Sequence, residues 1–343
     1  MRLPSFDLVQ PATLDEAAGI LESEGPDSKV IAGGTDLVVA LKQRIRPPRL
    51  LVSLEGVTGH RHIEFDPDTG LRVGALATLT EIAESPVVRE HYPALAQSAA
   101  AVASPQIRNR GTLGGNLCLD KRCWYFNQSY DWRSAHGFCL RAGGESCAVV
   151  QGADQCYSIV TADTATALMA LEAELVVINP AGGRRLPLSE FFAGLGDETN
   201  VLGQAELLAE VRLPAPPPGS SGVYLRHAAR GAIDYPIVQV AVVLQTEANV
   251  CRRAGVAVGA VTLTPVRATA AEEVLAGQEI TPDLAQQAAK AAMRQIKPIP
   301  FIIRTPGYKR LVGRGFIEAA IRMAAGLDAD DARQPLAQGD DTV

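Results

Sequence analysis

The sequence predicts an α+β protein with two domains. The chain has 343 residues, 47% of them hydrophobic and 20% charged, which is ordinary globular composition and enough length for more than one core. Short apolar strands alternate with helical segments until a proline-rich stretch at 214–222, after which long apolar strands precede several helices. We therefore place one domain over 1–215, a smaller α+β domain over 222–326, and an acidic, disordered tail over 327–343.

In the first domain, capping residues mark the helices and glycines end the strands. Thr13 is a helix cap, and Glu16 three residues later is expected to complete a capping box. Strands are expected at 29–32, 50–54, 71–75 and 175–178. Helices are expected at 13–18, 37–42, 80–85, 93–103 and 164–171. Residues 104–117 are expected to form a polar, glycine-punctuated loop.

The region after the proline-rich linker has a simpler pattern. Two apolar runs, 237–244 and 254–261, are expected to pair as neighbouring strands. Helices are expected at 269–275, 282–295 and 308–325.

Charge and hydropathy exclude several classes of protein. The net charge of −6, without a basic stripe, argues against a nucleic-acid partner. No apolar run reaches membrane-spanning length and the N-terminus lacks an apolar signal core, so we expect no membrane partner and a cytoplasmic protein. Thiols stay reduced there, which favours metal binding over disulfides for clustered cysteines.

Two glycine-rich loops are candidates for binding a phosphorylated cofactor. Residues 30–36 form a strand, a glycine turn and a helix start, and residues 111–116 form a second loop with hydroxyl and carboxamide side chains. Glycines let backbone amides approach an anion, and a helix N-terminus adds free N–H groups. Neither loop has the Rossmann or Walker pattern, and a plain glycine turn is the alternative for each. Together they indicate a bipartite dinucleotide site.

Four cysteines, Cys123, Cys139, Cys147 and Cys156, crowd an aperiodic segment at 118–157. Thiolates select zinc, Cu(I) or iron–sulfur clusters, and four of them suit a [4Fe–4S] cubane. Structural zinc sites usually use close Cys-x-x-Cys pairs, which are missing here, so the spacing favours a cluster without excluding zinc. Scattered core cysteines are the remaining alternative. Cys118 is a fifth candidate, and Cys251 is interpreted as a core residue.

These motifs resemble a known family. Residues 32–36 (AGGTD), 104–116 (SPQIRNRGTLGGN), 163–165 (DTA), 256–261 (VAVGAV) and 264–267 (TPVR) make the chain similar, over nearly its whole length, to the flavin subunits of the molybdenum hydroxylase (xanthine dehydrogenase) family. The resemblance implies a two-part FAD-binding domain of the PCMH type, followed by a smaller α+β C-terminal domain.

The resemblance also implies which residues contact FAD. The two glycine loops would bind the pyrophosphate, Asp163 would contact the cofactor, and Leu208 and Arg226 would lie near the flavin. The loop positions are Ala32, Gly33, Gly34, Thr35, Asp36, Ile107, Gly111, Thr112, Gly114, Gly115 and Asn116. No catalytic acid–base pair is expected on this chain.

Most family members lack the segment at 118–157, which is similar to the insert in β subunits of 4-hydroxybenzoyl-CoA reductases. That similarity implies a [4Fe–4S] cluster on Cys123, Cys139, Cys147 and Cys156, with Cys118 as a non-ligand. It also implies a molybdenum-cofactor large subunit, a small subunit with two [2Fe–2S] clusters, and ferredoxin or a similar carrier. The alternatives are the same subunit in an oxidative molybdenum hydroxylase of another substrate, and a zinc-stabilised binding module without redox activity.

Overall fold

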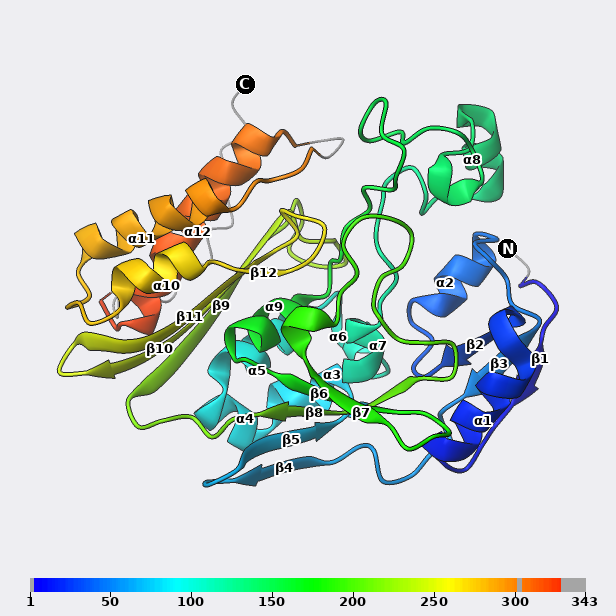
Figure 1. Ribbon diagram of the computed structural model, residues 1–343, viewed down its shortest axis with the longest axis horizontal. Helices are drawn as coiled ribbons and strands as arrows, with labels where there is room; N and C mark the ends of the chain where they lie inside the picture. Colours follow the sequence, from blue (N-terminus) through cyan, green and yellow to red (C-terminus); the bar gives the residue numbers. More distant parts are fainter. Residues whose placement is uncertain (1–2, 301–303, 328–343) are drawn as a thin grey trace.

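The computed structural model describes residues 3–300 and 304–327, which form three sheets with helices packed around them (Figure 1). The predicted tail lies, from residue 328 onward, outside these residues. The α+β class is confirmed, and the first domain has two parts, each built on its own sheet.

The first part is a three-stranded parallel sheet in the order β1-β3-β2. Its strands are β1 (Asp7–Val9), β2 (Ser28–Ile31) and β3 (Leu50–Ser53), and its helices are α1 (Leu14–Glu24) and α2 (Leu37–Lys42), with a short 3₁₀ turn at Gly25–Asp27. The Thr13 hydroxyl caps α1 by accepting the Glu16 N–H at 3.1 Å. The Glu16 carboxylate accepts from Ala12 at 2.8 Å, one residue before the position that a capping box requires.

The second part is a five-stranded antiparallel sheet in the order β4-β5-β8-β6-β7. Its strands are β4 (Ile63–Asp66), β5 (Gly70–Gly74), β6 (Glu174–Ile178), β7 (Arg184–Pro187) and β8 (Leu207–Leu213). The main helices against it are α3 (Leu79–Glu84), α4 (Pro86–His91), α5 (Pro93–Ala101) and α9 (Asp163–Ala170), and Leu188–Glu190 forms a 3₁₀ turn. Buried apolar side chains of this sheet and these helices form the largest core.

The loop predicted at 104–117 contains two short helices, α6 (Pro105–Arg108) and α7 (Leu113–Leu117), so that part of the prediction is wrong. Proline occupies the first position of α6, where its missing N–H costs nothing. The Thr112 hydroxyl caps α7 by accepting the Gly115 N–H at 3.0 Å, and Leu113 and Leu117, four residues apart, are both buried. Glycine and asparagine inside α7 conceal this short helix from a propensity argument.

The cysteine-rich insert projects from the first domain and carries α8 (Tyr130–His136) and a 3₁₀ turn at Leu140–Ala142 (Figure 1). Its two ends are joined, because Arg122 and Ile159 exchange backbone hydrogen bonds of 2.7 and 3.0 Å. The buried Arg133 guanidinium docks α8 onto the segment after α2 by donating to the Gln43 carbonyl at 3.0 Å.

The C-terminal part is a four-stranded antiparallel sheet in the order β12-β11-β10-β9. The strands are β9 (Ser220–His227), β10 (Val238–Glu247), β11 (Val250–Gly259) and β12 (Val266–Arg267). Helices α10 (Thr269–Leu275), α11 (Pro282–Gln295) and α12 (Pro306–Ala324) cover one face, and α5 and α9 contact the other (Figure 1). Residues 220–222 of the predicted linker belong to β9. Within 3–300 and 304–327, no helix is long and apolar enough to cross a membrane.

Candidate cofactor site

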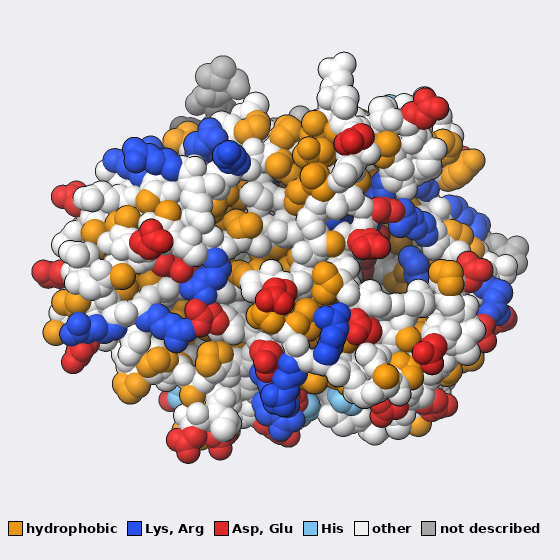
Figure 2. Space-filling view, viewed as in Figure 1, with side chains coloured by type: hydrophobic (Ala, Val, Ile, Leu, Met, Phe, Trp, Pro, Cys, Tyr) orange, Lys and Arg blue, Asp and Glu red, His pale blue; other side chains and the backbone are white. Residues whose placement is uncertain are grey.

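A large cavity of about 2000 Å³ lies between the two parts of the first domain and the insert. Figure 2 shows a hollow between the insert and the N-terminal part, with basic and acidic side chains at its rim. Every predicted FAD position except Arg226 lines this cavity: Ala32, Gly33, Gly34, Thr35, Asp36, Ile107, Gly111, Thr112, Gly114, Gly115, Asn116, Asp163 and Leu208. The fold therefore brings together residues that are up to 176 positions apart in the sequence.

The two glycine loops lie against each other, backbone to backbone. A Cβ on Gly33 would fall 1.7 Å from the Arg110 carbonyl oxygen, so only glycine fits at this contact. Gly34 has φ +71°, a conformation that other residues rarely adopt. The glycines thus create one continuous edge of backbone along the cavity, which a long phosphorylated ligand can approach without meeting side chains.

Asn116 connects the second loop to α9. Its side-chain oxygen accepts a hydrogen bond of 2.6 Å from the Thr164 hydroxyl and a longer one of 3.3 Å from the Thr164 N–H. Because this oxygen already accepts hydrogen bonds within the protein, the carboxamide nitrogen is the group of Asn116 that is left to donate to a ligand.

Asp163 is the most deeply buried carboxylate at the cavity. It accepts hydrogen bonds from the Tyr224 hydroxyl at 2.8 Å and forms an ion pair of 2.9 Å with the Arg226 guanidinium. Burial raises the pKa of Asp163, and the Arg226 charge and the Tyr224 hydrogen bond act in the opposite direction. Arg226 is the one predicted position outside the cavity lining, and it reaches the site through Asp163.

Sequence reasoning missed several charged and aromatic residues of the cavity, which are Lys29, Asp120, Arg122, Glu206, Asp234 and Tyr235. Arg122 forms an ion pair with Asp36 and lies 4.9 Å from the centre of the Tyr235 ring. Burial lowers the pKa of Lys29, while the nearby Asp120 carboxylate raises it. These residues come from the insert and from three other regions of the chain, and none of them belongs to a local sequence motif.

A second, smaller cavity of about 280 Å³ lies inside the insert, and all four predicted cluster ligands line it: Cys123, Cys139, Cys147 and Cys156. Cys118 lines the large cavity instead, and Cys251 is fully buried in the C-terminal core. The part of the chain that the structure describes contains no group of three or more His, Cys, Asp or Glu side chains arranged to hold a single metal ion.

Hydrogen-bond donors point at two of these sulfurs. The Cys123 sulfur accepts from the backbone N–H groups of Phe126 and Tyr125, and the Cys156 sulfur accepts the Ser158 N–H at 3.4 Å. Burial raises the pKa of Cys123 to about 11, and the two amide donors oppose that effect. Amide donors favour a thiolate over a thiol, but at Cys123 burial is the larger effect.

Buried cations surround the cysteine cavity. The Lys121 side chain is fully buried and donates to the Gly194 carbonyl at 2.5 Å. The Arg141 guanidinium lies 4.4 Å from the centre of the Phe126 ring, and the Arg133 guanidinium lies 5.8 Å from the same centre. Arg141 lines the cavity and is paired with Asp120 and Asp197, while Lys121 and Arg133 lie near it.

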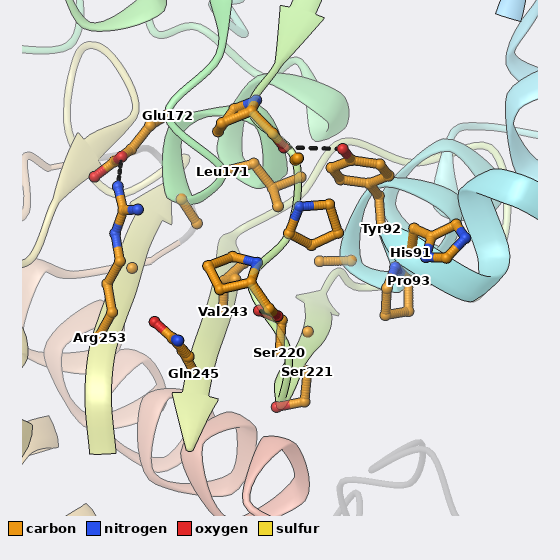
Figure 3. A pocket seen from close by; sticks show the side chains of 18 residues that line it. His91, Tyr92, Pro93, Leu171, Glu172, Ser220, Ser221, Val243, Gln245 and Arg253 are labelled. Atoms are coloured by element: carbon orange, nitrogen blue, oxygen red, sulfur yellow. Dashed lines mark hydrogen bonds and ion pairs between the residues drawn. The ribbon is translucent and has the colours of Figure 1, made fainter. Parts of the chain in front are cut away.

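A third cavity, of about 640 Å³, lies where the linker crosses between the domains (Figure 3). The Tyr92 hydroxyl donates to the Pro214 carbonyl at 2.9 Å, and Glu172 forms ion pairs with Arg253 and Arg267. None of the predicted site residues lines this cavity, so we interpret it as part of the domain junction.

Comparison with known families decides what kind of protein has this architecture. Residues 4–216 match the family described as the FAD binding domain in molybdopterin dehydrogenase. Residues 223–324 match the CO dehydrogenase flavoprotein C-terminal domain. The chain belongs to the FAD-binding subunits of the molybdenum hydroxylase family. The resemblance drawn from the sequence motifs is thereby confirmed at the level of the family.

Relatives of this flavoprotein family cover nearly the whole chain. The nicotine 6-hydroxylase medium subunit of Paenarthrobacter nicotinovorans is 30% identical over 94% of this chain and 100% of its own length. The aldehyde oxidoreductase FAD-binding subunit of Escherichia coli (strain K12) is 34% identical over 73% of this chain and 80% of its own. The solved carbon monoxide dehydrogenase from Hydrogenophaga pseudoflava has a chain that is 26% identical, with a TM-score of 0.79 over 95% of this chain and 99% of that one.

Proposed function

We propose that this chain is the FAD- and [4Fe–4S]-carrying electron-transfer subunit of a molybdenum-containing complex similar to 4-hydroxybenzoyl-CoA reductase. It would pass electrons between ferredoxin, or a similar carrier, and two [2Fe–2S] clusters on a small subunit. A large subunit with the molybdenum cofactor would carry out the substrate chemistry. The single observation that carries the proposal is the convergence of four cysteines on one cavity in an FAD-binding subunit.

The large cavity fits FAD. Its backbone edge along Gly33, Gly34 and Gly111 provides amides without side chains in the way, as a pyrophosphate needs. The cavity extends over both glycine loops, and Asp163 supplies a buried carboxylate at its wall. We propose that the predicted positions lining it are the FAD contacts of this chain.

We propose that the cysteine cavity holds a [4Fe–4S] cluster. Such a cluster binds one cysteine at each iron, so its four ligands surround a cavity and do not meet at a point. Cys123, Cys139, Cys147 and Cys156 surround the cavity in this way. Backbone N–H groups directed at Cys123 and Cys156, and buried cations nearby, compensate the negative charge of thiolate ligands. Bound there, the cluster would exchange single electrons, and the flavin one or two.

Metal analysis of the anaerobically purified complex tests the cluster. We expect about four irons, with acid-labile sulfide, beyond those of the small subunit, as cubane stoichiometry requires. Cys147→Ser should lose these irons. Cys118→Ser and Cys251→Ser remove thiols outside the cysteine cavity and should retain them. Zinc in place of iron would support the zinc-stabilised alternative and contradict the proposal.

A second candidate function is the equivalent subunit of a complex that hydroxylates another substrate oxidatively. The relatives favour it, since they include subunits of a nicotine 6-hydroxylase and an aldehyde oxidoreductase. Assays of the complete complex separate the two: reduction of 4-hydroxybenzoyl-CoA by a low-potential donor supports the first. Oxidation of another substrate with no activity on the thioester supports the second. The isolated chain should turn over neither substrate in either case.

A further inference from the structure

The Arg141 side chain connects the lining of the cysteine cavity with that of the large cavity. Arg141 lines the cysteine cavity, and only 1% of its side chain is exposed. Its guanidinium donates to the carboxylates of Asp120 and Asp197, each at 2.6 Å, and to the Lys121 carbonyl at 2.7 Å. Asp120 lines the large cavity. One ion pair therefore extends from one cavity to the other.

The two carboxylates that pair with Arg141 differ mainly in their position relative to the large cavity. Their side chains are similarly exposed, 44% for Asp120 and 41% for Asp197. Asp197 forms its second ion pair with Arg46 and lies outside the lining of the large cavity. Asp120 accepts a further hydrogen bond of 3.2 Å from the Thr199 hydroxyl. Against the burial that lowers it, both carboxylates raise the pKa of Lys29, a residue of the large cavity, and Asp120 does so more strongly. Of the two carboxylates on Arg141, only Asp120 lines the large cavity.

Arg122 is another residue near both cavities, because it precedes Cys123 and lines the large one. Its guanidinium, however, pairs with Asp36 and stacks on Tyr235, both of which also line the large cavity. Its charge is therefore neutralised within the lining of the large cavity. Arg141 and Asp120 remain as the pair that connects the sites.

Fixed charges shift the potential of a nearby redox group, and the interaction energy rises as the effective dielectric constant falls, as it does around the buried Arg141 guanidinium. Reduction adds negative charge, so a nearby carboxylate opposes it and a nearby guanidinium favours it. We propose that the Asp120–Arg141 ion pair is an electrostatic link between the cluster and the flavin, and that it sets the reduction potentials of both. This inference depends on the proposed function, because it requires a cluster in the cysteine cavity and FAD in the large one.

The test compares Asp120→Asn with Asp197→Asn in the assembled complex. Both substitutions keep the side-chain shape, and each removes one negative charge next to the Arg141 guanidinium. Cluster potentials are measured by redox titration with electron paramagnetic resonance, and flavin potentials by visible absorption. Both variants should shift the cluster potential to more positive values. Asp120→Asn should also shift the flavin potential to more positive values, by more than Asp197→Asn does, and should bind FAD at least as tightly as the wild type.

Three outcomes overturn the proposal, and they are distinguishable. Equal shifts of the flavin potential in the two variants would show that the loss of any nearby negative charge causes the shift, without a specific role for Asp120. Iron-containing Asp120→Asn protein with an unchanged flavin potential would show that the pair does not reach the flavin, and would leave the proposed function intact. Wild-type complex without the extra iron would contradict the proposed function, and this inference with it.

Discussion

Gly33 and Arg110 meet through their backbones: the Arg110 carbonyl oxygen occupies the space that any side chain at position 33 would need. This contact joins two loops that are almost 80 residues apart in the sequence. It gives a reason for glycine at position 33 that is independent of the ligand, whereas the sequence motif alone suggests only ligand binding. At least part of the glycine requirement in this site comes from the fit of one loop against the other.

Gly33→Ala should therefore force the loops apart and release FAD. A Cβ 1.7 Å from a backbone oxygen cannot be relieved by a side-chain rotation, so we expect at least a tenfold weaker affinity for FAD, measured by flavin fluorescence. Gly19→Ala is the matched control, because its Cβ meets nothing within 4 Å on α1, and it should be neutral or stabilising. Unchanged flavin content in Gly33→Ala would contradict this account of the loops.

Tyr224→Phe should weaken flavin retention from within the C-terminal domain. The substitution removes one hydroxyl donor from the buried Asp163 carboxylate, which should cost about 1–3 kcal/mol of stability. Tyr308→Phe removes a hydroxyl that bonds His227 at 2.8 Å, away from the large cavity. In Tyr224→Phe, the midpoint of urea unfolding and the flavin content should both fall. In Tyr308→Phe, the flavin content should be retained. Equal flavin loss in both would refute a specific effect through Asp163.

Glu206 should make stability depend on pH in the acid range. Hydrogen bonds of 2.9 Å from Arg184 to both carboxylate oxygens lower the pKa of Glu206 from 4.5 to about 2. Because folding lowers this pKa, the stabilisation from the Glu206–Arg184 pair is fully present above pH 4.5 and is lost as the pH falls toward 2. Glu206→Gln should cost about 1 kcal/mol at neutral pH after solvent screening, and less at pH 3. The exposed Glu190→Gln is the control, and a difference that stays constant with pH would contradict the prediction.

Arg133→Met should loosen the insert without unfolding the domains. Arg133 donates to the carbonyls of Gln43 and Arg44 and so holds α8 against the segment after α2. We expect faster cleavage within the insert under limited proteolysis, by several-fold, with little change elsewhere. Arg185→Met, whose side chain is 57% exposed, should be cleaved like the wild type. Identical cleavage of both variants would show that Arg133 does not anchor the insert.

The helices of the C-terminal domain are the elements that the sequence predicts best. Residues 269–275 and 282–295 were expected to be helical and are α10 and α11 with the same bounds. Threonine caps α11 and proline follows at its first position, so local signals and the buried alanine face agree. Helix α11 was predictable because its capping residues and the spacing of its apolar residues indicate the same bounds.

β8 was missed because its stabilisation is not local. Glu210 is buried in the middle of this strand, where a charge would normally argue against a core strand. Arg72 on β5 and Arg212 on β8 itself satisfy it with ion pairs of 2.7 and 2.5 Å, and His62 adds a contact of 2.9 Å. The first three residues of β9 lie in the predicted linker for a similar reason: Gly222, which favours a linker in the sequence, packs closely on Ala94 of α5.

The candidate site was predictable where it is built from motifs. The glycine loops and the four cysteines carry their own spacing, and the structure gathers each set around one cavity. Lys29, Glu206 and Tyr235 carry no such pattern, and only the tertiary fold brings them to the large cavity. The role of Arg226 depends on a side chain 63 residues earlier in the sequence, so its position behind Asp163 could not be read from the motif.

The joined ends of the insert have a consequence for how this subunit could have arisen. Arg122 and Ile159 pair directly, so the chain leaves the domain and returns to it at the same place. A short turn could span that point without disturbing any of the three sheets, and the segment between the two residues contains all four cysteines of the cysteine cavity. The insert thus leaves and rejoins the first domain at one point, so a flavoprotein of this type could gain or lose the whole cysteine-bearing segment in a single genetic event, while its glycine loops stayed in place.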